Sequence, residues 1–136
     1  MKNILGNVLK KYQSGFYVVF RVFVGLLFFQ HGAQKLFGWF GAQGTANLFS
    51  LMGVAGVIEV FGGLAIALGL LTRLAALGGI IDVIGAYFIA HFPQGWIPIM
   101  NKGELALLYF AAFLILIVYG AGKLSLERAI LKKELF

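Results

Sequence analysis

The stretch Gly15–Gly38, GFYVVFRVFVGLLFFQHGAQKLFG, decides the fold of this chain. It is long enough to cross the hydrocarbon core of a bilayer, which takes about 20 helical residues. The stretch is mostly apolar, yet it contains Arg21 and Lys35. An apolar run of this length predicts a membrane-spanning helix, and charged residues within such a helix usually face the neighbouring helices.

Three more apolar runs follow along the chain, and each is close to the length that a span requires. They predict membrane helices at Met52–Leu71, Leu74–Phe92 and Glu104–Gly122. None of them alternates polar and apolar residues as the strands of a membrane barrel do. The sequence therefore predicts an all-α fold, an integral membrane four-helix bundle that forms one domain over residues 1–136.

The composition agrees with a membrane protein and excludes a soluble enzyme, a disordered chain and a nucleic-acid binder. Hydrophobic residues make up 61% of the chain and charged residues 12%, about half of the usual share of roughly 25%. A soluble domain of 136 residues could not bury that much apolar surface. The net charge of +6 does not indicate nucleic acid, because the basic residues sit at the ends of apolar runs. The chain has no cysteine, so it offers no thiolate to an iron–sulfur cluster.

Lysine and arginine residues lie unevenly on the two sides of the predicted bundle. Lys35 and Lys102 fall on one side. The other side carries Lys2, Lys10, Lys11, Arg73, Lys123, Arg128, Lys132 and Lys133. By the positive-inside rule, this bias predicts that both termini are cytoplasmic and that the protein is a multi-pass protein of the cell membrane.

Two short flanking segments have the pattern of amphipathic helices. In the first, apolar residues recur at helical spacing between lysines: Ile4, Leu5, Val8, Leu9 and Tyr12. In the second, Ser125 is placed to cap a helix that has Glu127 in its first turn and Lys132 late. We expect both segments to lie on the inner membrane surface.

The ionisable residues inside the predicted spans are the most informative ones, because each costs at least ~2.5–3.5 kcal/mol near the centre of a bilayer. At a rise of ~1.5 Å per residue, Arg21 and Asp82 lie at similar depths, and Glu59 lies within reach of a long arginine side chain. We therefore expect charge pairing among Arg21, Glu59 and Asp82. Buried ion pairs can also serve only to fix the register of helices, so a structural role stays open.

A second set of polar residues gathers nearer the outer edge of the predicted bundle. A ligand-binding site or intramembrane polar cluster is expected from Arg21, His31, Gln34, Lys35, Glu59, Asn101 and Glu104. Aromatic side chains are expected beside it: Phe28, Phe37, Trp39 and Tyr109. A mostly apolar pocket with a few convergent polar groups is the usual form of a small-molecule site. No metal site is predicted, and no residue is assigned a catalytic role.

The predicted helices also carry short motifs in a particular order. They are Arg21-x3-Gly25-x2-Phe28-x2-His31-Gly32-x2-Lys35-Leu36-Phe37-Gly38, Glu59-x2-Gly62-Gly63-Leu64, Gly69-Leu70, Thr72-Arg73, Asn101-x-Gly103-Glu104 and Gly120-Ala121-Gly122. In order and spacing, these motifs resemble the DoxX family of small bacterial and archaeal membrane proteins. The resemblance implies a four-helix membrane bundle and the general label of an oxidoreductase. It also implies similarity to the small subunit of an archaeal thiosulfate:quinone oxidoreductase. Asp82 stands where the resemblance implies an apolar residue, which favours Arg21–Glu59 as the charge pair.

The favoured function is that of a membrane subunit of a redox system that binds quinone or a similar small apolar molecule. Phe28, Phe37 and Tyr109 are the expected walls of an apolar slot. Donors to the quinone carbonyls are expected from His31, Gln34 and Lys35, and protons from Glu59 or Glu104. Because the chain has no cysteine and no flavin or nicotinamide motif, the electrons must come from a soluble or membrane oxidoreductase partner or from a bound cofactor.

The alternative is a non-catalytic membrane anchor or assembly subunit for a soluble oxidoreductase, in which the intramembrane charges only hold the bundle together. Two other functions use the same residues. His31 and His91 lie at similar depth, which would suit a bis-His haem. A proton relay through Arg21, Glu59 and Asp82 would suit a small-solute carrier. The glycine-rich helix faces also favour a homo-oligomer in the lipid bilayer.

Overall fold

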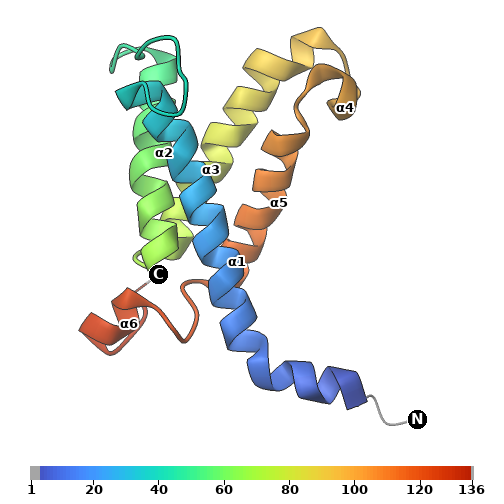
Figure 1. Ribbon diagram of the computed structural model, residues 1–136, viewed down its shortest axis with the longest axis vertical. Coiled ribbons are helices and arrows are strands. Elements are labelled where there is room, and N and C mark those ends of the chain that lie inside the picture. Colours follow the sequence, from blue (N-terminus) through green and yellow to red (C-terminus); the bar gives the residue numbers. More distant parts are fainter. Residues whose placement is uncertain (1–3, 136) are drawn as a thin grey trace.

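The computed structural model describes residues 4–135 of the chain. Its elements, in order, are α1 (Ile4–Phe37), α2 (Leu51–Leu68), α3 (Thr72–Ala86), the π-helical turn η1 (Tyr87–His91), the 3-10 turn η2 (Phe92–Gln94), α4 (Pro98–Asn101), α5 (Glu104–Tyr119) and α6 (Leu126–Leu131) (Figure 1). No strand occurs in the described part of the chain, so the all-α prediction is confirmed. Lys2, which contributed to the predicted orientation, lies outside the described residues.

Three helical segments are long and apolar enough to cross a membrane: Leu5–Phe37, Leu51–Leu68 and Thr72–Gln94. The fourth predicted span corresponds to α5, an apolar helix of 16 residues. At ~1.5 Å per residue, α5 is about 24 Å long, which is short of a hydrocarbon core of about 30 Å. The third span is longer than α3 because the helical path continues through η1 and η2.

The first helix is longer than predicted, because the amphipathic flank continues into the apolar run without a break. The N-terminal part of α1 turns aside from the rest of the helix, toward the lower right of Figure 1. The helix ends at Phe37, where Gly38 takes a left-handed backbone conformation with φ +67°. The flank is thus helical as predicted, and its location on a membrane surface stays a prediction.

The boundaries of the other helices follow from capping chemistry. The Ser50 side chain accepts a hydrogen bond from the Gly53 backbone N–H at 3.0 Å, which starts α2. Gly69 ends α2 in a left-handed conformation. The next helix, α3, begins at Thr72, slightly before the predicted start at Leu74. Ser125 caps α6 as predicted, accepting from the Arg128 N–H at 3.4 Å.

The helices pack as two pairs, α1 with α2 and α3 with α5, which are joined through α2 and α3 (Figure 1). Glycines bring the backbones of α1 and α2 together. A Cβ atom on Gly25 would lie 2.6 Å from the Gly63 carbonyl oxygen, and one on Gly32 would lie 2.6 Å from that of Gly56. Gly25 and Gly32 of α1 therefore face α2 within the chain.

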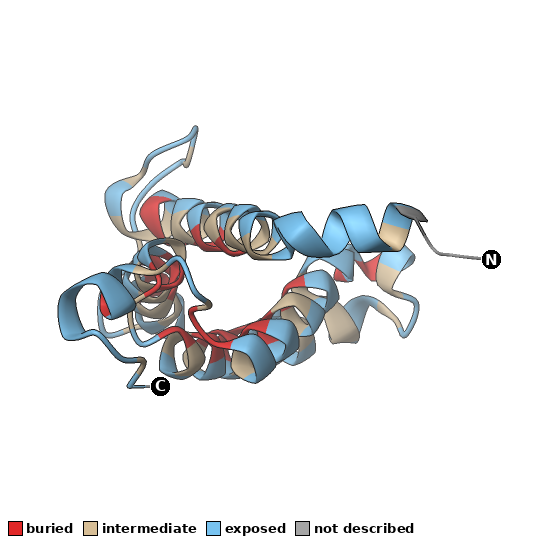
Figure 2. Cartoon of the chain, turned by 90° about the horizontal axis from the view of Figure 1, so that it is seen from below, coloured by how far each residue is buried: buried red, intermediate tan, exposed pale blue. Residues whose placement is uncertain are grey.

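The core lies between the two helix pairs. Seen from below in Figure 2, the buried residues lie on the inner faces of the helices and the exposed residues on the outer faces. The core is made of Phe28, Ile66, Ala76, Val83, Tyr109, Phe113 and Leu116. Many large apolar side chains on the outside are exposed, as expected of surfaces that contact lipid.

Candidate functional site

An ion pair between α1 and α2 is the centre of the candidate site. The Lys35 Nζ atom donates a hydrogen bond to Glu59 Oε1. The Glu59 side chain is 6% exposed and the Lys35 side chain 24%. A Cβ on Gly56 would lie 2.9 Å from the Leu36 side chain and 3.2 Å from Lys35 Cβ, so glycine at this position allows α1 and α2 to approach beside the ion pair. Each charge therefore compensates the burial of the other.

The carboxylates in this region outnumber the cations. Glu59 Oε2 is buried and has no hydrogen-bond partner. Asp82 of α3 is 9% exposed and makes no hydrogen bond within residues 4–135. It lies near enough to Glu59 for their charges to repel, and near enough to Lys35 for attraction. The Lys35 ammonium group is thus hydrogen-bonded to one buried carboxylate, that of Glu59, and attracts a second one, that of Asp82, by charge alone.

His31 and Tyr109 complete this group of residues. Their ring centroids lie 5.9 Å apart, with the rings edge to face. His31 lies one helical turn before Lys35 and interacts electrostatically with its ammonium group. Tyr109 of α5 interacts in the same way with the Glu59 carboxylate. We call His31, Lys35, Glu59, Asp82 and Tyr109 the central polar cluster.

An apolar pocket of about 390 Å³ lies between α1 and α5 and reaches this cluster. Its lining consists of Phe20, Val24, Leu27, Leu105, Leu108, Tyr109, Ala111, Ala112 and Ile115. Leu27 and Leu108 are 47% and 67% exposed, so the pocket opens toward the lipid-facing surface. Tyr109 belongs to both the pocket and the central polar cluster, so the two are adjacent at this residue.

Several residues expected beside the site lie elsewhere. Phe28 is buried in the core, where its ring packs against those of Tyr109 and Phe113. Phe37 is 48% exposed and packs against Trp39. Of the expected slot of Phe28, Phe37 and Tyr109, Tyr109 alone lines this pocket, and Phe28 packs against Tyr109 from the core. The first helix contributes Phe20, Val24 and Leu27 instead.

Three of the expected polar residues also lie apart from the cluster. Gln34 and Glu104 are exposed. Asn101 is fully buried, but it binds its own loop: its amide donates to the Gly95 carbonyl at 2.8 Å, and its Oδ1 accepts from the Gly103 N–H at 2.8 Å. His91 Nδ1 lies 3.0 Å from the Asn101 carbonyl oxygen. His91 and His31 thus have different partners, which gives no support to a shared haem.

Arg21 does not pair with Glu59 or Asp82 in the structure. Its guanidinium is buried and donates to backbone carbonyls, from Nη1 to Ala121 and to Leu124 at 3.0 Å, and from Nη2 to Ala67 at 3.4 Å. Carbonyls at and beyond helix C-termini lack intrahelical partners and carry partial negative charge, so they satisfy a cation without a carboxylate. The expected pairing of Arg21 with a carboxylate is wrong, because the loop after α5 brings the carbonyls of Ala121 and Leu124 to its guanidinium group.

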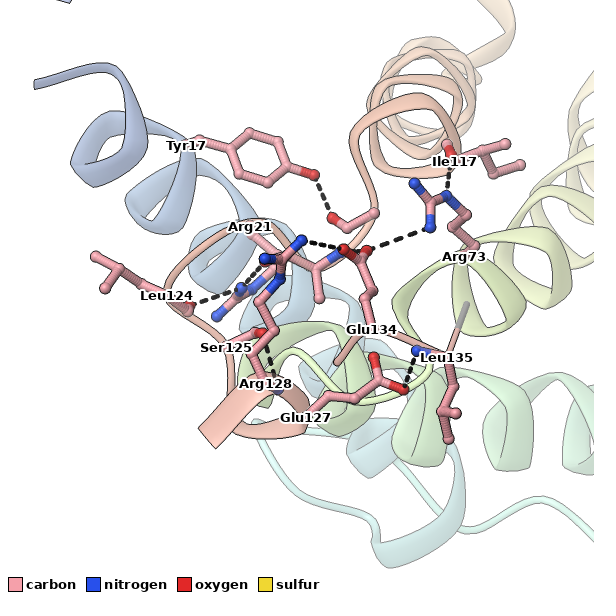
Figure 3. Close-up of polar contacts among 12 residues, drawn as sticks. Tyr17, Arg21, Arg73, Ile117, Leu124, Ser125, Glu127, Arg128, Glu134 and Leu135 are labelled. Atoms are coloured by element: carbon pink, nitrogen blue, oxygen red, sulfur yellow. Dashed lines mark hydrogen bonds and ion pairs between the residues drawn. The ribbon is translucent and has the colours of Figure 1, made fainter. Parts of the chain in front are cut away.

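A second polar group, which the sequence did not indicate, surrounds Arg21 at this end of the bundle (Figure 3). The Glu134 carboxylate accepts from Arg73 Nη1 at 3.2 Å, from Arg128 Nη2 at 3.0 Å and from the Ala121 N–H at 2.8 Å. Burial opposes its ionisation, but the bonds from Arg128 and Ala121 and the charge of Arg73 hold the pKa of Glu134 below its usual range.

Glu127 lies beside these residues and is buried. Its Oε1 accepts from the Leu135 N–H at 3.2 Å, so it also ties the segment after α6 to the bundle. We call Arg21, Arg73, Glu127, Arg128 and Glu134 the basal cluster. In the sequence, Arg73 and Arg128 contributed only to the predicted orientation in the membrane. The signal that could have indicated this cluster is Glu134, an acidic residue that directly follows Lys132 and Lys133.

Comparison with known proteins adds family information. Residues 16–92 match the model of the DoxX family. An uncharacterized protein of Haemophilus influenzae is 39% identical, over 93% of this chain and 99% of its own length. The Escherichia coli inner membrane protein YqjF is 31% identical, over 92% of this chain and 99% of its own. A Bacillus subtilis protein named "Putative oxidoreductase CatD" is 28% identical, over 85% and 87%. No solved structure matches the chain.

These matches and the three long apolar helices agree on the location of the protein. YqjF is named an inner membrane protein, and three segments have the length and apolarity of membrane spans. The predicted multi-pass membrane location is confirmed.

Proposed function

The chain belongs to the DoxX family, and from this premise we propose that it is the membrane subunit of a redox system that binds quinone or a similar small apolar molecule. The observation that carries the proposal is the apolar pocket between α1 and α5, which is lined in part by Tyr109 of the central polar cluster. A pocket of about 390 Å³ is within the usual size range of small-molecule sites, roughly 300–1,000 Å³.

The pocket suits a molecule with an apolar ring and polar carbonyls. Its lining is apolar apart from the phenol of Tyr109, and it opens toward lipid, from which such a molecule would enter. The proposed donors to the carbonyls are the Tyr109 hydroxyl, His31 and Lys35. Tyr109 lines the pocket and its ring lies edge to face with that of His31, one turn before Lys35, so these donors would orient the molecule.

The carboxylates of the cluster are the proposed proton-holding groups. A bound quinone supplies an acceptor for two electrons and two protons, and the electrons would come from a soluble or membrane oxidoreductase partner. Glu59 keeps Oε2 without a partner, and Lys35 balances only one of the two buried carboxylates. Glu59 and Asp82 together are therefore suited to hold a proton within the central polar cluster.

The proposed architecture is one domain with four spans, α5 being the fourth, and with both termini in the cytoplasm. Supporting it, Arg73, Lys123 and Arg128 belong to the loops and ends that the positive-inside rule assigns to the cytoplasm. A homo-oligomer has less support, because Gly25, Gly32, Gly56 and Gly63 pack α1 against α2 within one chain.

The test is to fill the pocket without touching a charge. In Ala112→Phe the new ring would occupy the pocket, whereas Val118→Phe adds the same ring on a 69% exposed position of α5 outside it. We expect Ala112→Phe to lose a soluble quinone analogue that wild type and Val118→Phe retain in lipid nanodiscs, measured by native mass spectrometry. Retention by Ala112→Phe would contradict the proposal.

The anchoring alternative is separated by Glu59→Gln. Loss of quinone binding or turnover with a normal yield of folded protein favours the redox subunit. Loss of folded protein, with unchanged activity per folded molecule, favours an anchor in which the ion pair only joins α1 to α2.

A further inference from the structure

The surroundings of Glu134 have the form of an anion-binding site that the chain itself occupies. One carboxylate accepts hydrogen bonds from two guanidinium groups and one backbone N–H, at 2.8–3.2 Å (Figure 3). Hydrogen bonds of this charge-assisted kind are the strong ones in oxyanion recognition. We propose that Arg73, Arg128 and the Ala121 N–H form a receptor for a phosphate group, with Glu134 as its built-in competitor.

Two of the three donors are held in place without the help of Glu134. Arg73 is fixed by a hydrogen bond from its Nε to the Ile117 carbonyl at 2.8 Å. The Ala121 N–H is presented by a turn in which Gly120 has φ +64°, a conformation that favours glycine. A Cβ on Gly120 would lie 1.9 Å from Glu134 Oε1, so glycine is also required for an oxyanion to approach.

The receptor has more charge and more donors than Glu134 uses. Two guanidinium groups face one carboxylate, whereas a phosphate monoester carries roughly −1.5 to −2 at neutral pH. In the described structure Arg73 donates to Glu134 through Nη1, and Arg128 through Nη2, out of five N–H groups on each. A phosphate would therefore match the receptor better than the carboxylate does.

A phosphate from outside can reach the receptor. The side chains of Arg73 and Arg128 are 40% and 46% exposed. Glu134 stands in a non-helical segment beyond the end of α6 at Leu131, so its release unfolds no helix. The phosphate could be free in solution or belong to an acidic lipid headgroup, because the chemistry of recognition is the same. The inference does not depend on the proposed redox function.

The first test removes the competitor. We expect Glu134→Gln in the full chain to bind inorganic phosphate about tenfold more tightly than wild type by calorimetry at constant ionic strength. A second substitution, Arg128→Gln, should reverse the gain about tenfold, the effect of losing one charge-assisted hydrogen bond. Lys133→Gln is the matched control, because it removes one charge from the same segment and should leave the affinity unchanged.

The second test uses the unaltered protein and identifies the source of the phosphate. Phosphate should speed trypsin cleavage after Lys132 and Lys133 relative to chloride, because displacement of Glu134 frees this segment. Nanodiscs with phosphatidic acid in place of phosphatidylcholine should do the same if the source is a headgroup. A response to either source supports the receptor. No response beyond chloride, an equal effect of Lys133→Gln, or tighter binding of an acidic peptide than of phosphate would overturn it.

Discussion

The two polar regions of the bundle treat their charges differently. In the basal cluster every charged residue makes a hydrogen bond: Arg21 has three carbonyl acceptors and Glu134 has three donors, although Arg21 Nε and Glu127 Oε2 are buried without a partner. In the central polar cluster Glu59 has one partner for two oxygens, and Asp82 makes no hydrogen bond within residues 4–135. Buried polar groups are costly when unpaired, so we expect the basal cluster, which makes more hydrogen bonds, to stabilise the fold more than the central polar cluster does.

The two clusters also differ in what surrounds them. The basal cluster is covered by the loop after α5 and by the segment after α6, whereas the central cluster borders the apolar pocket. Substitutions in the basal cluster should therefore reduce stability most. Substitutions in the central cluster should reduce stability less than they reduce ligand binding.

Arg21→Met should have the largest effect. The substitution leaves the carbonyls of Ala67, Ala121 and Leu124 without their donor, which should lower the free energy of unfolding by about 3 kcal/mol or more. Equilibrium unfolding of purified protein in mixed detergent micelles measures it. Arg128→Met, at a 46% exposed position, should cost under about 1 kcal/mol. Equal losses in the two variants would contradict a special role for the buried guanidinium.

Gly63→Ala should have the next largest effect, at the seam that holds Lys35 against Glu59. The added methyl group would lie 2.5 Å from the Phe29 nitrogen and 2.7 Å from the Gly25 carbonyl oxygen, so α1 and α2 must separate. We expect a loss of about 1–3 kcal/mol, as for other overpacked contacts. Gly62→Ala is the control, since its nearest new contacts lie at 3.8 Å. Should both variants unfold alike, the seam is looser than described.

Much of this architecture could be predicted from sequence, because apolar run length and helical periodicity are local properties. These properties predicted where the four long apolar helical segments lie. Lys35 and Glu59 belonged to the expected polar set because both lie on inward faces. The partner of Arg21 could not be predicted, since Ala121 lies 100 residues away in a loop whose path depends on tertiary packing. The position of Asn101 could not be predicted for a similar reason, because its hydrogen bonds to Gly95 and Gly103 lie within its own loop.

Lowering the pH should weaken the basal cluster through Glu134. Its folded-state pKa lies below the unfolded value because Arg128, Ala121 and Arg73 stabilise the carboxylate against the opposing effect of burial. The contribution is therefore present above the unfolded pKa of about 4.5 and is lost as the pH falls through the folded value. The difference in unfolding free energy between wild type and Glu134→Gln should be about 1 kcal/mol at neutral pH. A difference that does not shrink on acidification would rule out this assignment.

Glu59→Gln should change stability by less than about 1 kcal/mol, because the amide keeps the shape and Lys35 can turn toward Asp82. Binding of the quinone analogue should fall by tenfold or more if Glu59 is a functional group of the pocket. Parallel measurements of unfolding and of ligand retention decide between the two effects. Should stability fall as far as in Arg21→Met while binding persists, the central cluster would be structural after all.

Asp82→Asn should have the smallest effect on stability, and its sign is the informative part. Asp82 is buried and makes no hydrogen bond in the described structure. The cost of desolvating its charge is therefore offset only by the attraction of Lys35. The neutral amide should leave the unfolding free energy unchanged or raise it by up to about 1 kcal/mol. Asp82→Leu should raise it at least as much, because α3 is then apolar at this depth. A loss above about 1 kcal/mol in either variant would mean that Asp82 has a partner as firm as those of the basal cluster, and the contrast between the two regions would disappear.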